Sequence, residues 1–165
     1  MRYSKPETLN LSAHLNRNNC LEDLNQLILN EGYSDAAPVT IDNKIVLNMD
    51  CVESELAKEE ARNQNMSMDS AFVIVSNDKS IMEILLVEFR FNYQSLTHLK
   101  KDDLLNKVSG STNALKNTLN IHQRYIFVFS SNLKEQAVRW LFRKYPRVPS
   151  NYVAIDIAEL KSLLF

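Results

Sequence analysis

The sequence predicts an α/β domain in which a central mixed sheet is flanked by helices. Its 165 residues are about one domain's length. Its 45% hydrophobic and 24% charged residues are typical of a globular protein. Helix and strand patterns alternate along the chain without a repeat or a low-complexity linker, which is typical of a layered sheet with crossover helices. We therefore expect a single domain, residues 1–165, with an N-terminal helix and hairpin (1–50), a core (52–130) and a C-terminal helix-strand-helix (131–165).

The first part of the chain is expected to contain a helix, a hairpin and a second helix. An apolar stripe predicts a helix over about residues 20–31, capped by Asn19. The short apolar pieces 38–41 (PVTI) and 44–49 (KIVLNM) flank an Asp-Asn turn and predict a hairpin. Residues 52–64 lack Gly and Pro, so we expect a helix with its many carboxylates facing water.

A second hairpin is predicted over residues 71–92. The run AFVIV is followed by a polar turn and by IMEILLVEFRF, whose continuous apolar character is typical of a strand covered on both faces. The remaining predicted elements are helices at about 97–108 and 112–118, a strand at 124–130, a helix at 132–145 halted before Pro146, a strand at 151–155 and a helix at 156–165. On the helix 132–145, Trp140 and Phe142 are expected to pack in the core.

Several classes of protein are excluded by composition. No apolar run approaches the 18 to 20 or so residues that span a bilayer, and the N-terminus lacks the apolar region of a secretory signal, so a cytoplasmic protein is expected. Cys20 and Cys51 are widely spaced, so neither a zinc site nor a disulfide is expected. With two glycines, Gly32 and Gly110, the chain has no phosphate-binding glycine loop for a nucleotide cofactor.

The charges are divided unevenly along the chain. Residues 1–96 hold 8 Lys and Arg against 15 Asp and Glu, whereas residues 97–165 hold 11 against 5. A basic C-terminal half is suited to phosphate contacts with nucleic acid, and an acidic N-terminal half to a protein partner. The alternative is that both sets of charges lie on solvated helix faces.

Two carboxylates are expected to meet on the hairpin at 71–92. Asp69 opens its first strand and Glu88 lies near the end of the second, so folding the hairpin places Asp69 opposite Glu88 and Arg90. Glu88 and Arg90 are two residues apart and point to the same face of the strand. Such a cluster is suited to holding Mg²⁺ together with a substrate phosphate, as in phosphodiester hydrolysis.

Asp69, the strand AFVIV and the segment LLVEFR resemble the motif of the PD-(D/E)XK nuclease superfamily, with E-x-R in place of E-x-K. The helix and strand that follow fall where that restriction-endonuclease-like fold has its next elements, so the resemblance covers residues 52–130. It implies that Asp69 and Glu88 are ligands of Mg²⁺. It also implies a third carboxylate, from Glu55 or Glu59 on the preceding helix.

Arg90 replaces the family's lysine, which helps to position the attacking water. An arginine can bind phosphate through two donors but is permanently charged and larger, so it is no equivalent. Lys100 or Lys107 on the next helix would have to take over. The sequence therefore favours a nuclease-like domain retained as a binding or accessory protein, for example of the immunity type. The alternatives are a Mg²⁺-dependent DNA or RNA phosphodiesterase, and a chance match in which the charged residues form a simple ion-pair group.

Overall fold

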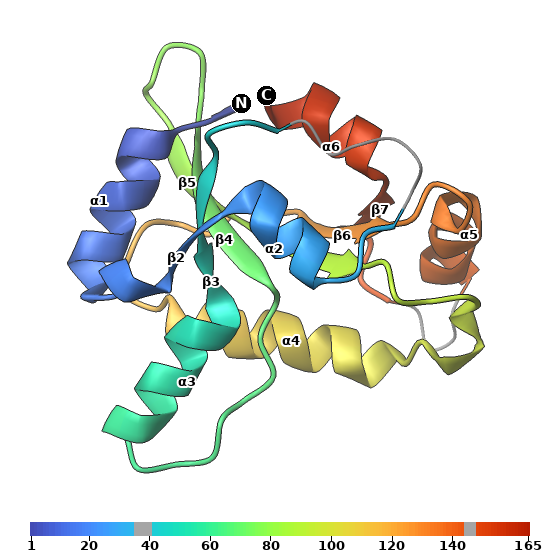
Figure 1. Cartoon of the computed structure of the whole chain (residues 1–165), viewed down its shortest axis with the longest axis horizontal. Coiled ribbons are helices and arrows are strands. Elements are labelled where there is room, and N and C mark those ends of the chain that lie inside the picture. Colours follow the sequence, from blue (N-terminus) through green and yellow to red (C-terminus); the bar gives the residue numbers. More distant parts are fainter. Residues whose placement is uncertain (35–40, 144–147) are drawn as a thin grey trace.

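A seven-stranded mixed sheet lies between helices in the computed structural model (Figure 1), which describes residues 1–34, 41–143 and 148–165. The strands are β1 Arg2–Tyr3, β2 Leu21–Asp23, β3 Ile45–Asn48, β4 Ser70–Val75, β5 Met82–Arg90, β6 Tyr125–Phe129 and β7 Tyr152–Ile155. The helices of the described residues are α1 Lys5–Leu15, α2 Leu24–Asn30, α3 Met49–Glu59, α4 Lys101–Ala114, α5 Lys134–Arg143 and α6 Ile157–Leu164. The predicted α/β class, with a mixed sheet flanked by helices, is confirmed.

The sheet changes from antiparallel to parallel at β5. Its strand order is β2-β3-β4-β5-β6-β7, and the short β1 adds to β4. Strands β2 to β5 pair antiparallel, whereas β5, β6 and β7 run parallel. Parallel neighbours need a crossover, and here α4 connects β5 to β6 and α5 connects β6 to β7. The carboxyl ends of β5 and β6 therefore lie side by side.

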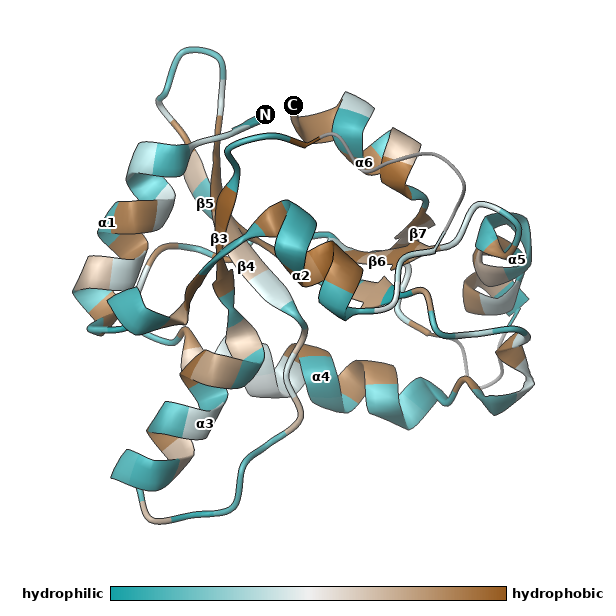
Figure 2. Cartoon of the chain, in the orientation of Figure 1, coloured by the Kyte–Doolittle hydropathy of each residue, from teal (hydrophilic) through white to brown (hydrophobic). Residues whose placement is uncertain are grey.

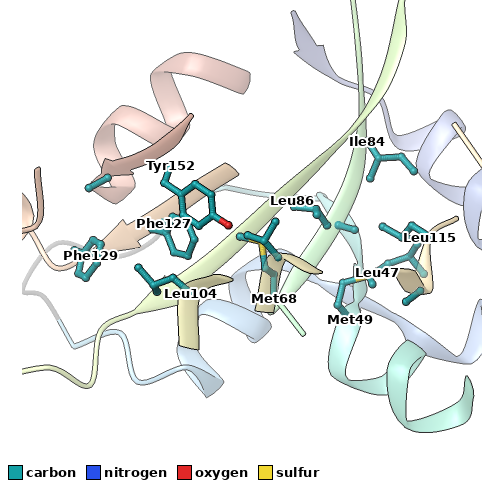
Figure 3. Packing of buried hydrophobic residues seen from close by; sticks show 14 of the residues in the cluster. Leu47, Met49, Met68, Ile84, Leu86, Leu104, Leu115, Phe127, Phe129 and Tyr152 are labelled. Atoms are coloured by element: carbon teal, nitrogen blue, oxygen red, sulfur yellow. The ribbon is translucent and has the colours of Figure 1, made fainter. Parts of the chain in front are cut away.

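Apolar side chains cover both faces of the sheet. One core cluster joins the sheet to α1, α3, α4 and α5, and the other joins it to α2 and α6. Figure 3 shows the first cluster, in which the rings of Phe127 and Tyr152 stack and to which Leu104 of α4 and Met68 also belong. In Figure 2 the strands are mostly brown, whereas the helices alternate brown and teal, because each helix buries one stripe and exposes the other to water. Strand β5 is buried between the two layers.

The second half of the chain agrees well with the sequence patterns. The hairpin at 71–92 is confirmed as β4 and β5, and the predicted strands at 124–130 and 151–155 are β6 and β7. Helix α6 begins at a capping box formed by Asp156 and Glu159. Helix α5 matches the start of its prediction, while the predicted end, residues 144–145, lies outside the described residues.

Two predicted helices of the first half of the chain differ in extent. The first begins only at Leu24, because Leu21–Asp23 pairs with β3 and Asp23, not Asn19, caps the helix through the backbone amide of Asn25 at 3.0 Å. The helix predicted at 52–64 is α3, Met49–Glu59, capped by Asn48. Its carboxylates do not all face water: Glu53 is fully buried and pairs with Arg62.

The helices predicted at 97–108 and 112–118 are one continuous helix, α4, preceded by a short 3-10 turn, η2 Leu96–His98. Gly110 lies inside this helix without breaking it. A Cβ atom at this position would lie 1.9 Å from the carbonyl oxygen of Met66, so the glycine permits close packing against the segment before β4.

The first predicted hairpin is described only in part. Residues 38–40 lie outside the described residues, and β3 pairs with β2 and β4. Residues 1–15, where no helix or strand was predicted, form β1 and α1. Within the described residues, no helix is long and apolar enough to cross a membrane.

Two predictions about particular side chains are wrong. Cys20 and Cys51 form a disulfide, which links the turn before β2 to the first turn of α3. The two cysteines are far apart in the sequence, but the pairing of β2 with β3 brings them close together in the fold. Phe142, expected in the core, is 80% exposed, because Ala137 and Leu141 form the buried stripe of α5, whereas Trp140 is partly buried and does pack against the core cluster.

Candidate functional site

The β4–β5 register brings Asp69 and Glu88 together. Ser70 is paired with Val87, so the preceding Asp69 lies beside Glu88. The Asp69 carboxylate accepts a hydrogen bond at 2.5 Å from the backbone amide of Phe89, which fixes one of its oxygens against β5. The predicted opposition of these two carboxylates is therefore present in the fold.

Glu88 and Arg90 point toward the layer that contains α4. Their neighbours Ile84 and Leu86, at alternate positions of β5, belong to the core cluster under α4, whereas Val87 and Phe89 belong to the other cluster. Glu88 and Arg90 thus lie on the same core-facing side of β5 as Ile84 and Leu86, but they are charged. Arg90 Nε lies 2.9 Å from Glu88 Oε1, and Arg90 also donates to the hydroxyl of Tyr93 at 3.1 Å.

Lys107 completes the cluster from α4. Its Nζ lies 2.7 Å from Glu88 Oε1 and 3.2 Å from Asp69 Oδ1, so a single ammonium bridges both carboxylates. Lys107 reaches this position because Leu104 and Val108, its neighbours on α4, are buried against the sheet. We refer to Asp69, Glu88, Arg90 and Lys107 as the four-residue charge cluster.

The carboxylates of this cluster are withdrawn from water. The side chains of Glu88 and Asp69 are 1% and 4% exposed, against 16% for Lys107. Burial, reinforced by the charge of Asp69, raises the pKa of Glu88 to about 8 despite the two cations, and burial likewise raises the pKa of Asp69. For Lys107, burial alone would lower the pKa of the ammonium. Attraction to the charges of Glu88 and Asp69 is stronger, so the pKa of Lys107 is raised.

Three buried polar atoms of the cluster have no hydrogen-bond partner among the described residues. One is an acceptor, Glu88 Oε2, and two are donors, Arg90 Nη2 and Arg90 Nε, the latter in ion-pair contact with Glu88 Oε1. Buried polar atoms are nearly always paired, because an unpaired one costs about 1–3 kcal/mol. Glu88 Oε2 and Arg90 Nη2 thus leave one acceptor and one donor that the described residues do not satisfy.

Further acidic side chains act on this cluster from neighbouring elements. Glu31, at the end of α2, has its pKa raised to about 7 by burial and by the charges of Asp69 and Asp50. Asp50, in the first turn of α3, accepts a hydrogen bond from Ser67. Glu31 was not predicted as a site residue from the sequence. It lies at the end of a predicted helix, and no local pattern there indicates that this helix end would lie close to Asp69.

The other predicted site residues have different surroundings. Glu55 pairs with Arg17 at 3.5 Å and accepts a hydrogen bond from Asn19, next to the disulfide. Glu59 also pairs with Arg17. Lys100 is exposed at the start of α4. Of the residues named from the sequence, the structure brings together Asp69, Glu88, Arg90 and Lys107, while a ligand role for Glu55 stays a prediction.

Comparison of the chain with protein-family models, with curated proteins and with solved structures found no significant match. By its fold and its charge cluster, the chain is an α/β protein with a seven-stranded mixed sheet and a buried group of two carboxylates and two cations.

Proposed function

We propose that this chain is a Mg²⁺-dependent phosphodiesterase with a restriction-endonuclease-like core. The observation that carries the proposal is the position of Lys107, whose ammonium bridges Asp69 and Glu88. Arg90 occupies the strand position where the resembled motif has its lysine, and Lys107 brings an ammonium to the same two carboxylates from the next helix. The missing lysine of the motif is thus supplied from another element.

The residues present fit a divalent cation. Mg²⁺ binds through one or two carboxylates and keeps several waters. Asp69 and Glu88 would hold the ion, and Glu88 Oε2 is a buried acceptor without a partner among the described residues. When bound, Mg²⁺ polarises a phosphoryl oxygen and lowers the pKa of a bound water.

The two cations have separate tasks in this proposal. Lys107, which contacts both carboxylates, would orient the attacking water and stabilise charge on the phosphate. Arg90 binds a phosphate oxygen through Nη2, whose hydrogens have no acceptor among the described residues, while its Nε stays beside Glu88. Tyr93 accepts from Nη1 and keeps the guanidinium in place.

The second candidate function is a binding or accessory protein that keeps this fold without activity. It is supported by the charge balance of the cluster, because Lys107 and Arg90 neutralise Asp69 and Glu88 without a metal ion. In that case the acidic N-terminal half is the surface for a protein partner. The cytoplasmic location expected from the sequence also stays a proposal, and the Cys20–Cys51 disulfide argues against it, since such bonds persist mainly in oxidising compartments.

Calorimetric titration with Mg²⁺ and Mn²⁺, followed by a cleavage assay on mixed DNA and RNA, separates the two candidates. We expect binding and metal-dependent cleavage by the wild type. We expect both to be lost in an Asp69→Asn, Glu88→Gln variant, and cleavage alone to be lost in Lys107→Met. Glu83→Gln, on the same strand and outside the cluster, is the matched control and should behave as the wild type. Absence of metal binding in the wild type would refute the phosphodiesterase proposal.

A further inference from the structure

A shallow groove of about 480 Å³ lies between α5 and the turn η2. Its α5 wall consists of Gln136, Arg139, Trp140 and Arg143, and its other wall carries Ser95 and Thr97. We call it the η2–α5 groove. The sequence patterns had placed Trp140 in the core, so this surface was not anticipated.

The α5 wall is one continuous face of the helix. Positions 136, 139, 140 and 143 are spaced by three and four residues, which brings their side chains together. Arg139 and Arg143 are exposed, and neither has an ion-pair partner within residues 1–34, 41–143 and 148–165. The nearby acidic residue of α5, Glu135, pairs with Lys134 at 3.3 Å. The groove thus combines two positive charges with the partly buried indole of Trp140, which also packs against the core.

We propose that the η2–α5 groove binds single-stranded nucleic acid. Trp140 would stack on a base, Arg139 and Arg143 contact the phosphates on either side, and Ser95 and Thr97, whose hydroxyls hydrogen-bond to each other at 3.1 Å, line the opposite wall. An aromatic platform between cations is the combination by which single strands are bound without a required sequence. The inference rests on the proposed function and names its substrate class.

An unpaired strand fits this groove better than a duplex or an acidic peptide. The bases of a duplex are stacked on one another, so a duplex would present only its backbone to the arginines and leave Trp140 without a role. An acidic peptide would satisfy the arginines but offers no planar group for the indole. A single strand uses both features of the groove together.

The groove and the charge cluster lie at the same end of the sheet. Arg90 ends β5 and is paired with Phe129, the last residue of β6. The chain leaves β5 toward η2 and leaves β6 toward α5, and these two elements contact each other. In Figure 1, α5 stands beyond the end of β6 and the segment from β5 to α4 passes below it. A strand held in the groove therefore has a short path to Lys107 and Arg90.

Fluorescence titration tests this proposal directly, because Trp140 is the only tryptophan of the chain. An oligothymidylate and an oligouridylate of about twelve nucleotides, a length within the range of known single-strand sites, are added in EDTA so that no metal-dependent reaction interferes. We expect quenching of the emission and an affinity that falls with salt. For an Arg139→Gln, Arg143→Gln variant we expect about tenfold or greater loss of affinity, and a salt slope reduced by about 1.4 for two phosphate contacts.

The matched control removes two lysines elsewhere. A Lys58→Gln, Lys116→Gln variant changes the net charge equally at exposed positions outside the groove and should keep nearly the wild-type affinity. Equal losses in the two variants would reduce the effect to net charge and overturn the proposal. So would an absence of quenching, or equal or tighter binding of a duplex or of polyglutamate. Because the titration needs no metal, loss of binding with cleavage intact would overturn this proposal alone, whereas binding without cleavage would overturn the phosphodiesterase proposal and with it the assignment of the bound strand as its substrate.

Discussion

Replacement of Lys107 by methionine should destabilise the fold in a pH-dependent way. The ammonium contacts Glu88 at 2.7 Å and Asp69 at 3.2 Å, and both carboxylates are buried. Methionine preserves much of the apolar stem but leaves two carboxylates facing a single cation, Arg90. Removal of one partner from a buried ion pair typically costs about 3–5 kcal/mol when the remaining charge stays ionised. We expect a loss of this size at alkaline pH.

The sign of the pH dependence follows from the carboxylates. The pKa of Glu88 is raised from 4.5 to about 8 in the folded protein, so the folded state binds a proton that the unfolded state releases between these values. Stability from this group is therefore greatest below 4.5 and is lost as the pH rises to about 8. Lys107 lowers the pKa of both carboxylates, so its loss raises them further. The variant should accordingly lose more stability than the wild type as the pH increases.

Urea denaturation near pH 5 and near pH 9 measures this difference, with roughly 1 kcal/mol or less expected at the lower pH. A Lys107→Met, Glu88→Gln variant should regain much of the loss at the higher pH, because the uncompensated charge has been removed. Lys116→Met, just beyond α4 and exposed, is the control and should change little. A loss that is the same at both pH values, or that simply adds to the effect of Glu88→Gln, would refute the reasoning.

Three further predictions concern the disulfide, the packing of α4 and the metal site. Replacing Cys20 and Cys51 by serine should lower the free energy of unfolding by about 3–4 kcal/mol, as expected for a loop closed across 31 residues, and a reductant should destabilise the wild type but not this variant in urea denaturation. Gly110→Ala should cost about 1–3 kcal/mol because its Cβ would lie 1.9 Å from the Met66 carbonyl oxygen, while the exposed Ser109→Ala should be nearly neutral; equal effects would contradict this account. Mg²⁺ affinity by calorimetry should rise with pH up to about 8, because protonation of Glu88 competes with the ion; a flat profile would exclude Glu88 as a ligand.

Local sequence patterns were sufficient to predict those strands and helices whose own residues show the apolar pattern and turn residues of the element. The continuous apolar runs and turn residues of the β4–β5 hairpin placed Asp69 opposite Glu88, and two-residue spacing placed Glu88 and Arg90 on one face. Lys107 was one of two lysines named on the next helix. The sequence did not distinguish it from Lys100, because that choice depends on how α4 rotates to bury Leu104 and Val108.

Features that depend on distant pairing were not accessible from the sequence. Leu21–Asp23 has the helical pattern of the residues that follow it, and only its pairing with β3 makes it a strand. The same pairing brings Cys20 to Cys51. Glu31 likewise comes under the influence of Asp69 only because the end of α2 lies against the residues after β5, where Asn92 donates to its carbonyl oxygen at 3.1 Å. In each case a tertiary contact outweighs local propensity.

The two ends of the sequence meet over the central strand. Tyr3 packs edge-on against both Phe72 of β4 and Phe165, and the amide of Val73 donates to the Thr8 hydroxyl at 3.0 Å. During synthesis the first of these residues leaves the ribosome long before Phe165 does. The face of β4 near Tyr3 therefore stays incompletely covered until α6 and Phe165 have been synthesised. Slow translation of the C-terminal segment would prolong that interval and favour aggregation of the nascent chain.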